Sequence, residues 1–235
     1  MKNNINYAGW ELKYFDKALN FRRYQFSLIK EYICGEVAEV GPGNGVNLKI
    51  YQSQAKKIHL FEPSKIFIKK LKKYKNKNKN KNKKIKIVNS VFKKSKNKYN
   101  TIIYLDVLEH IKNDSKEIFN AYSSLKKNGY LIINVPAFQH LYSRFDKDLM
   151  HFKRYAKKDF KKILYSLKIY NYKMIYFDCL GYFFSLLSKI FIKNYKKKFG
   201  SKILIWNKLM PLSIIFDRLF LNFFGKSLIV FIKKS

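Results

Sequence analysis

Three glycines at alternate positions, Gly41, Gly43 and Gly45, constrain the fold of this chain more than any other feature. They follow the short apolar run 37–40, which is typical of a strand. Glycine permits backbone angles with φ > 0 and lets a ligand approach the backbone closely. The next residues, 46–54, are predicted to form a helix whose N-terminal amides point back into the turn. This order predicts a nucleotide-type site at the carboxyl end of a parallel sheet.

The complete pattern is Glu39-x-Gly41-x-Gly43-x-Gly45. It differs from the dinucleotide-binding fingerprint, which needs glycine or alanine where Val46 stands. The pattern resembles motif I of the class I S-adenosylmethionine-dependent methyltransferases, in particular the bacterial type 11 and type 12 enzymes.

This resemblance implies a fold, a cofactor and a reaction. The implied fold is α/β and Rossmann-like, with a mostly parallel seven-stranded sheet, helices on both faces and a helical insertion before the last strand. The implied cofactor is S-adenosylmethionine, and the implied reaction is methyl transfer. The implied cofactor-binding residues are Glu39, Gly41, Pro42, Gly43, Asn44, Gly45, Glu62, Ser90, Val91, Asp106 and Val107.

Apolar segments that alternate with helical patterns support such a sheet, because this alternation is typical of βαβ units. A helix is predicted over 115–125, between the fourth and fifth strands. A further helix at 156–167 and a strand at 172–177 follow, and the last strand, 227–232, is expected to be antiparallel. The first five predicted strands are 37–40, 58–61, 85–88, 101–105 and 130–136.

The ends of these strands carry the remaining cofactor residues. Glu62 ends the second strand, where an acid can accept two hydrogen bonds from a ribose. After the third strand this chain has Ser90, where many family members carry an acid for the adenine amino group, so backbone atoms are expected to contribute there. Segment 106–111 resembles the loop that closes over the methionine end of the cofactor.

After the fifth strand, His151-x-x-Arg154-Tyr155 resembles a segment found in a subset of bacterial methyltransferases. Many of those proteins have glycine where this chain has Met150, so the local backbone is expected to differ. The segment lies on the substrate side, and we assign substrate binding to Tyr142, Arg154 and Tyr155.

The chemistry follows from the cofactor, because a sulfonium methyl is already activated and the protein mainly aligns the acceptor. A hydroxyl acceptor would be helped by a general base, for which His151 is the first candidate and His110 the second. Arg154 could hold an acidic substrate group through a bidentate contact, or it could pair with Asp146 or Asp159.

A metal site is the competing interpretation of Asp106-x-x-Glu109-His110. It is similar to the E-x-x-E-H site of ubiquinone-pathway O-methyltransferases and small-RNA 2′-O-methyltransferases, and such ligands suit a divalent ion. Asp106 is shorter than the glutamate of that motif, and V-L-E-H-I is common in members without metal. We therefore assign no metal ligand.

The insertion before the last strand contains two apolar stretches, 181–192 and 203–224. Lys189, Lys208 and Asp217 interrupt them, so neither is a convincing transmembrane span. Two interpretations remain. The helices could cover the sheet edge and wall the substrate pocket, or they could form an amphipathic platform on an anionic membrane.

The chain has 235 residues and a formal net charge of +35. Such a charge attracts polyanions or anionic membranes without specifying either. The Lys-Asn run 75–84 has no apolar residue and is predicted to be a loop. Cys34 and Cys179 suggest buried thiols and neither a disulfide framework nor a metal site.

The N-terminus lacks the pattern of a secretory leader, so we expect a cytoplasmic protein, with peripheral contact to the inner face of the membrane as an option. Segment 15–24 is similar to the helix before motif I in the same methyltransferase subset. We predict one methyltransferase domain over 1–235, divided into an N-terminal helical segment 1–33, a cofactor-binding core 34–177, a helical insertion 178–226 and a last strand 227–235.

The sequence therefore predicts S-adenosylmethionine-dependent methyl transfer to a small-molecule, glycan or lipid-linked acceptor at a hydroxyl. RNA methylation is an alternative that the charge favours, although no RNA-binding motif is recognisable. A non-catalytic module that binds a membrane or a polyanion on a decayed fold is the other alternative, and the intact Glu39, Gly41, Gly43, Gly45 and Glu62 count against it.

Overall fold

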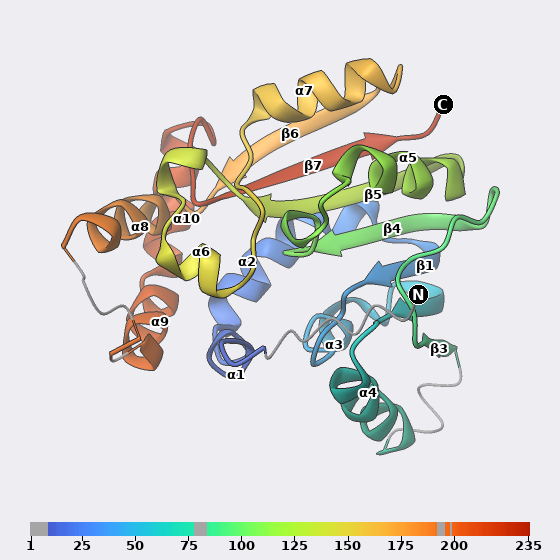
Figure 1. The fold of residues 1–235 in the computed structure, drawn as a ribbon, viewed down its shortest axis with the longest axis horizontal. Coiled ribbons are helices and arrows are strands. Elements are labelled where there is room, and N and C mark those ends of the chain that lie inside the picture. Colours follow the sequence, from blue (N-terminus) through green and yellow to red (C-terminus); the bar gives the residue numbers. More distant parts are fainter. Residues whose placement is uncertain (1–8, 78–83, 192–195, 198) are drawn as a thin grey trace.

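In a computed structural model that describes residues 9–77, 84–191, 196–197 and 199–235, seven strands of the described chain form one sheet (Figure 1). The strand order is β3-β2-β1-β4-β5-β7-β6. The neighbours β1–β2, β1–β4, β2–β3 and β4–β5 are parallel, and β7 is antiparallel to both β5 and β6. The strands are β1 (Gly35–Val40), β2 (Ala55–Phe61), β3 (Ile85–Val88), β4 (Tyr99–Leu105), β5 (Leu125–Pro136), β6 (Tyr172–Phe177) and β7 (Ser227–Lys233).

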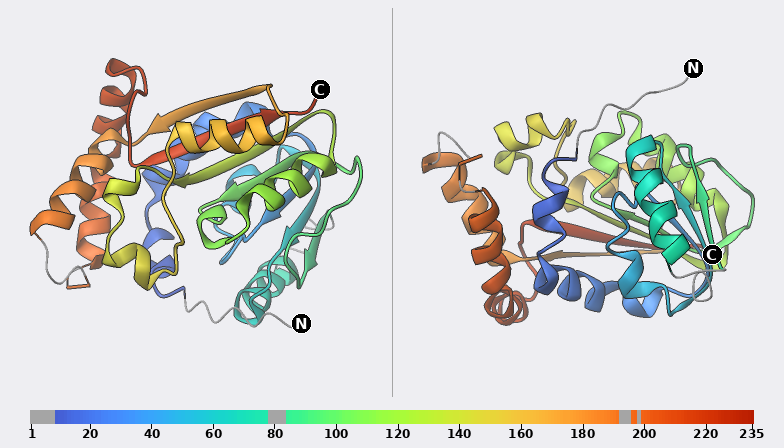
Figure 2. Two further views of the ribbon diagram at one scale, coloured as in Figure 1. Left: turned by 45° about the horizontal axis from the view of Figure 1, so that its top comes forward. Right: turned by 90° about the horizontal axis from the view of Figure 1, so that it is seen from below.

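Helices cover both faces of this sheet, as the views in Figure 2 show. Short 3₁₀ segments lie at Lys30–Tyr32, Leu108–His110 and Gln139–Leu141. The predicted fold class is therefore confirmed. The helices of the described chain are α1 (Leu12–Phe15), α2 (Leu19–Ile29), α3 (Leu48–Tyr51), α4 (Lys65–Lys77), α5 (Asp114–Ser124), α6 (Arg144–Asp148), α7 (Lys157–Ser166), α8 (Cys179–Phe191), α9 (Phe199–Lys208) and α10 (Met210–Leu219).

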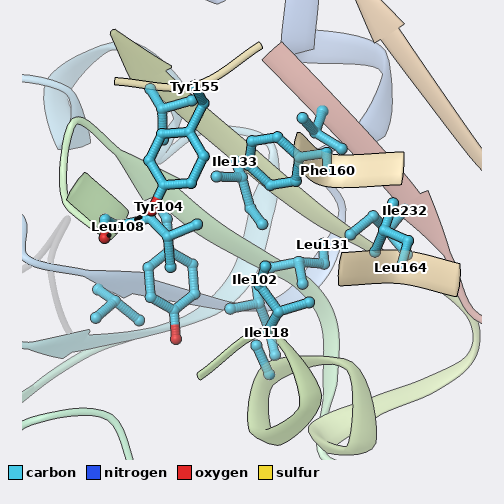
Figure 3. Close-up of a cluster of buried hydrophobic side chains, with 14 of the residues drawn as sticks. Ile102, Tyr104, Leu108, Ile118, Leu131, Ile133, Tyr155, Phe160, Leu164 and Ile232 are labelled. Carbon is cyan, nitrogen blue, oxygen red and sulfur yellow. Dashed lines mark hydrogen bonds between the residues drawn. The ribbon is translucent and has the colours of Figure 1, made fainter. Parts of the chain in front are cut away.

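Alternating side chains of the central strands build two cores, because successive residues of a strand point to opposite faces. Leu131 and Ile133 of β5 enter the cluster that includes Phe160 of α7, which Figure 3 shows in close-up. Ile132, between them, packs into the other cluster, together with residues of α2 and α9. Both faces of the sheet are therefore buried, as is typical of a parallel sheet.

The strand order places a switch point at the middle of the sheet. After β1 the chain builds β2 and β3 on one side, and β4 and β5 then lie on the other side. Ligands of open α/β sheets bind in the crevice beyond the carboxyl ends of strands at such a point. In the register, Val40 at the end of β1 is opposite Tyr104, so the glycine turn and the loop after β4 leave the sheet side by side.

Three local predictions were wrong. Cys34, predicted to be a buried thiol, is exposed, whereas Cys179 is buried as predicted. The helix predicted over 46–54 is only one turn, Leu48–Tyr51, because β2 already begins at Ala55 and the chain must turn back before it. The loop prediction over 75–84 is wrong for 75–77, because α4 continues through Lys77, and residues 78–83 lie outside the described residues. Lysine and asparagine at the end of α4 still belong to a helix whose apolar residues Phe67, Ile68 and Leu71 are buried.

Three helices, α8, α9 and α10, form the insertion between β6 and β7, and they lie beyond the carboxyl ends of β4 and β5 (Figure 1). In the described residues, none of the helices is both long and apolar enough to cross a membrane.

Candidate active site

The glycine turn after β1 has the backbone that its sequence predicts. Gly41, Gly43 and Gly45 have φ angles of +64°, +53° and +73°, which side chains of L-residues rarely permit. A Cβ atom at Gly41 would lie 2.7 Å from Cγ2 of Val107, in the loop after β4. The Gly41 amide donates to the carbonyl of Phe61 at 2.9 Å. The turn is therefore wedged between the ends of β2 and β4.

Glu62 lies next to this turn, at the end of β2, and is 4% exposed. Its Oε2 accepts from the Gly43 amide at 3.1 Å, and its Oε1 accepts from the Ser64 amide at 2.8 Å. Burial raises the pKa of Glu62, and these two amide hydrogen bonds oppose that shift. Each carboxylate oxygen has a second lone pair, so the group can still accept from the two hydroxyls of a ribose.

Glu39 lies inside the protein, below the turn. Its Oε2 accepts from the Tyr51 hydroxyl at 2.6 Å. Burial raises the pKa of Glu39 to about 7, and hydrogen bonds from Tyr51 and Asn47 oppose this shift. The carboxyl group thus anchors α3 under the glycine turn. Its assignment to direct cofactor binding stays a prediction.

Residues of the N-terminal helices approach the same turn. Asn44 donates from Nδ2 to Oδ2 of Asp16 at 2.7 Å, and Arg22 donates from Nη1 to Oδ1 of Asn47 at 2.6 Å. Burial lowers the pKa of Arg22, while the charges of Asp16, Asp106 and Glu39 oppose this shift. The sequence predicts a covering helix here but gives no separate signal for Arg22.

Asp106 and Val107 lie across the turn, at the end of β4. Asp106 has a φ of +57°, and its Oδ1 accepts from Nδ2 of Asn134 at 2.7 Å. Asn134 also accepts from the Asp106 amide through its carbonyl, at 3.0 Å. The end of β5 therefore fixes this loop, and the side chain of Asp106 stays exposed.

The residues predicted for adenine lie after β3. Ser90 is half-buried, and its hydroxyl donates to the carbonyl of Val91 at 2.9 Å. Val91 itself is exposed. Asn89 donates from its side chain to the carbonyls of Glu62 and Pro63, at 3.0 and 3.1 Å, and so links this segment to the ribose-side acid.

On the β5 side, two predicted histidines lie together. The rings of His110 and His151 meet edge to face, with centroids 4.6 Å apart. Nδ1 of His151 lies 3.0 Å from Oδ1 of Asp146, and its Nε2 lies 3.9 Å from Oε1 of Glu109. The ring of His110 forms hydrogen bonds with the backbone of Met150 and Leu149. Met150, which stands where many related proteins have glycine, has a φ of +60°. This φ lies in the region that favours glycine, so the backbone keeps the glycine-like conformation.

The surroundings shift the pKa values of His110, Asp146 and Glu109 in different directions. Burial, and then the nearby His151, lowers the pKa of His110 to about 3, so its ring is neutral at pH 7. Burial alone would raise the pKa of Asp146, but hydrogen bonds from His151 and the Arg154 guanidinium hold it below its ordinary value. Burial, and then the charge of Asp106, raises the pKa of Glu109 well above its ordinary value.

The three predicted substrate residues have partners inside the protein. Arg154 donates from Nε and Nη2 to both carboxylate oxygens of Asp146, at 2.8 and 3.0 Å, which is one of the pairings considered from the sequence. Tyr155 is fully buried and donates to Asp114 at 3.0 Å. Tyr142 donates to the carbonyl of His151 at 2.7 Å. In this conformation all three support the site, and their contact with substrate stays a prediction.

A group of metal-type donors exists among the described residues. Donor atoms of Glu109, His110 and His151 all lie within 4.8 Å of one another. Asp106, which the E-x-x-E-H comparison would include, does not belong to this group. His151 belongs to this donor group only through the fold. It lies 41 positions after His110, and no local sequence motif connects the two histidines.

The residues around the glycine turn fit S-adenosylmethionine. A side chain at Gly41 would fill the space against Val107, and Glu62 offers a fixed acceptor for a ribose. The exposed Asp106 follows β4 beside the turn, where its carboxyl group could accept a hydrogen bond from a cofactor. Gly43, Glu62 and Asp106 would therefore be the first residues to hold it.

Comparisons with known proteins agree with this geometry. The profile of the family described as "Methyltransferase domain" matches residues 18–177. No curated protein sequence matches the chain. A phosphoethanolamine N-methyltransferase 2 from Haemonchus contortus, solved with S-adenosyl-L-methionine, has a similar structure, with a TM-score of 0.66 and 12% identity. That likeness covers 97% of this chain and 58% of the nematode chain, so this chain spans less than two thirds of that protein.

A second solved structure has about the same length. A SAM-dependent methyltransferase from Archaeoglobus fulgidus is similar with a TM-score of 0.60 and 18% identity, over 97% of this chain and 100% of the archaeal one. At such identities the structures show the shared fold, and the family match covers well over half of the chain. The related nematode enzyme was solved with S-adenosyl-L-methionine and, separately, with S-adenosylhomocysteine. The chain belongs to the methyltransferase-domain family.

Proposed function

We propose that this protein transfers a methyl group to a hydroxyl of a small-molecule, glycan or lipid-linked acceptor, and that His151 is the general base. The observation that carries the proposal is the contact between His151 Nδ1 and Asp146 Oδ1 at 3.0 Å. Because Asp146 keeps a low pKa, its carboxylate accepts the Nδ1 proton. The lone pair of the neutral ring is then on Nε2, the atom that faces Glu109.

The bound cofactor supplies a methyl group that its sulfonium already activates. The remaining work for the chain is to hold the acceptor oxygen in line and to remove its proton. Nε2 of His151 would take that proton, and the charge that forms on the ring would be stabilised by Asp146. Arg154 and the amide of Ser143 hold Asp146 in place, which makes Arg154 a positioning residue.

His110 is the weaker candidate for the base. Its lowered pKa makes the ring a poor proton acceptor at neutral pH. It packs edge to face against His151 and so restricts the orientation of that ring.

Metal-assisted transfer is a second candidate, and the carboxylate of Glu109 favours it. This side chain is 1% exposed, and neither of its oxygens has a hydrogen-bond partner within the described structure. A divalent ion between Glu109, His110 and His151 would satisfy it. His151 would then be a ligand, with Asp146 orienting the ring as carboxylates commonly do for metal-bound histidines.

The acceptor can be tested with radiolabelled S-adenosylmethionine and a panel of hydroxyl-bearing compounds that includes a free glycan and a polyprenyl phosphate sugar. We expect His151→Gln to lower kcat about 10²- to 10⁴-fold and to leave cofactor affinity unchanged. His140→Gln is the matched control, because His140 is exposed and contacts Tyr182 outside the histidine pair. Full activity of His151→Gln on an accepted compound would overturn the assignment of the base.

A further inference from the structure

The insertion carries a large exposed apolar surface. Leu221 and Phe223, in the turn after α10, are 87% and 81% exposed. Single exposed apolar residues are ordinary, but a contiguous apolar patch on a protein surface marks an interaction site. We define the apolar face as the six most exposed large apolar side chains of the insertion: Leu204, Ile205, Ile215, Leu219, Leu221 and Phe223.

The helical spacing places these side chains on outward stripes. In α10, Ile215 and Leu219 are four residues apart and exposed, whereas Ser213 and Asp217 are fully buried. In α9, Leu204 and Ile205 are exposed, while Ile203 and Trp206 pack into the core. In α10 the exposed stripe is thus more apolar than the buried positions, and in α9 both sides are apolar, so the inner contacts do not account for the outer stripe.

The insertion is held firmly on the domain, so the apolar face is the surface of a folded unit. Asp217 accepts from the Tyr24 hydroxyl of α2 at 2.8 Å and from the amides of Asp178 and Cys179 at 2.6 and 2.8 Å. Asp178 in turn accepts from Trp206 Nε1 at 2.9 Å. These contacts tie α8, α9 and α10 to α2 and to the end of β6.

The charges of the insertion have one sign at the surface. Its only acids in sequence are Asp178 and Asp217, and both are fully buried. Lys197 before α9, Lys208 at the end of α9 and Arg218 in α10 are exposed on the segments that carry the apolar face. An apolar surface with a basic border complements an anionic bilayer, into which apolar side chains insert while lysines and arginines reach the headgroups.

An aromatic groove adjoins the apolar face. Its volume is about 600 Å³, and Phe223 and Phe183 belong to its wall together with Phe138, Tyr176 and Tyr182. Phe138 has a φ of +61°, a strained backbone for a bulky residue, and its ring stacks on Tyr176 at 4.6 Å. Lys157 is the one charged residue of its lining, with Nζ 4.8 Å from the centre of the Tyr176 ring.

The groove and the active site are neighbours along the chain. Phe138 directly precedes Gln139–Leu141, and Tyr142 then bonds to the backbone of His151. The groove has the aromatic lining that suits a hydrocarbon chain, and Lys157 gives it a positive rim for an anionic headgroup.

We propose that α9, α10 and the turn after α10 dock on an anionic lipid bilayer through the apolar face, and that the aromatic groove receives a hydrocarbon chain from it. This inference rests on the proposed function where it narrows the acceptor to a lipid-linked compound; the docking itself stands independently of the catalytic assignment. Docking through this face would turn the carboxyl ends of β4 and β5 toward the membrane, because the insertion lies beyond those strand ends (Figure 1).

The test is co-sedimentation of the full chain with phosphatidylcholine vesicles, with and without phosphatidylglycerol, over a range of salt concentrations. The wild type should bind the anionic vesicles and bind less as salt rises, since exposed charges are screened. Leu221→Ser with Phe223→Ser should weaken this binding about tenfold, because two inserted side chains are lost. Tyr165→Ser with Tyr170→Ser is the matched control, because both tyrosines are exposed and lie on α7 and the loop after it.

The result that supports the proposal is loss of vesicle binding in the Leu221 and Phe223 variant alone, with the melting temperature and cofactor affinity unchanged. Equal binding by this variant and the control would overturn it. Heparin and RNA serve as further probes. If the wild type binds them as well as it binds vesicles, and the Leu221 and Phe223 variant still binds them, the interaction is nonspecific polyanion binding and the proposal is overturned. Failure of methyl transfer by a wild type that still docks would refute the proposed function and leave the docking in place.

Discussion

His151 Nδ1 and Asp146 Oδ1 are 3.0 Å apart, and this contact decides which nitrogen of His151 is free to accept a proton. Asp146 lies in α6 and His151 in the loop after it, and Arg154 donates two hydrogen bonds to the same carboxylate. The arrangement links a buried ion pair to the orientation of the proposed base.

Arg154→Met should destabilise the fold strongly, because it leaves the fully buried carboxylate of Asp146 without its cation. Removing one partner of a buried ion pair typically costs about 3–5 kcal/mol of unfolding free energy. Arg144→Met, at an exposed position of α6, is the control and should change stability by less than about 0.5 kcal/mol. Urea denaturation measures both, and equal stability of the two variants would contradict this description of the pair.

Gly41→Ala should impair both stability and cofactor binding more than Gly43→Ala. The two positions have similar φ angles, +64° and +53°, so the backbone strain of an alanine is comparable. Only at Gly41 does the new Cβ meet another side chain closely, at 2.7 Å from Val107, whereas at Gly43 the nearest atom is 3.3 Å away. Val107→Ala should partly rescue Gly41→Ala. Thermal melts and cofactor titrations of the three variants check this, and the absence of any rescue would exclude the clash as the cause.

Glu39→Gln should make stability less dependent on pH. The pKa of Glu39 is 4.5 for the free side chain and about 7 in the folded protein. Below the lower value both states are protonated. Between the two values the unfolded chain ionises first, so the stability of the wild type falls as pH rises, by on the order of 3 kcal/mol in total. The variant lacks this loss, and urea melts at about pH 5 and about pH 8 measure the difference. A constant difference between wild type and variant at both pH values would show that Glu39 is ionised throughout.

Chelation should leave methyl transfer unchanged if His151 acts as a base, since that mechanism uses no cation. Dialysis against EDTA, followed by assay with and without added Mg²⁺, Mn²⁺ or Zn²⁺, measures this. Activity that is lost on dialysis and restored by one of these ions would instead establish the second candidate, in which Glu109, His110 and His151 are ligands.

The sequence predicts those parts of the fold and site that depend on short, contiguous stretches of residues. The glycine turn, the acid at the end of β2 and all seven strands depend on local patterns of glycine, charge and apolar residues. Element boundaries were less accurate. The helix after the turn is short because Tyr51 must reach Glu39 and β2 begins at Ala55, and neither constraint is local.

The parts that could not be predicted depend on long-range contacts or on burial. Arg22 reaches Asn47 across the N-terminal segment, and no spacing rule connects them. Asp217 interrupts an apolar run in the sequence, but the structure makes it a buried acceptor that holds the insertion together. Hydropathy also misassigns the two sides of α10, because its buried positions include Ser213 and Asp217 while its exposed positions include Ile215 and Leu219.

Calorimetric titration of S-adenosylmethionine into the purified wild type, Gly43→Val and Glu62→Ala tests the central claim most directly. The account predicts saturable binding to the wild type and a strong loss of affinity in both variants. Valine at position 43 would occupy a backbone position with a φ of +53°, and alanine at position 62 would remove the fixed ribose acceptor. Absence of binding to a folded wild type, or equal affinity in all three proteins, would contradict it.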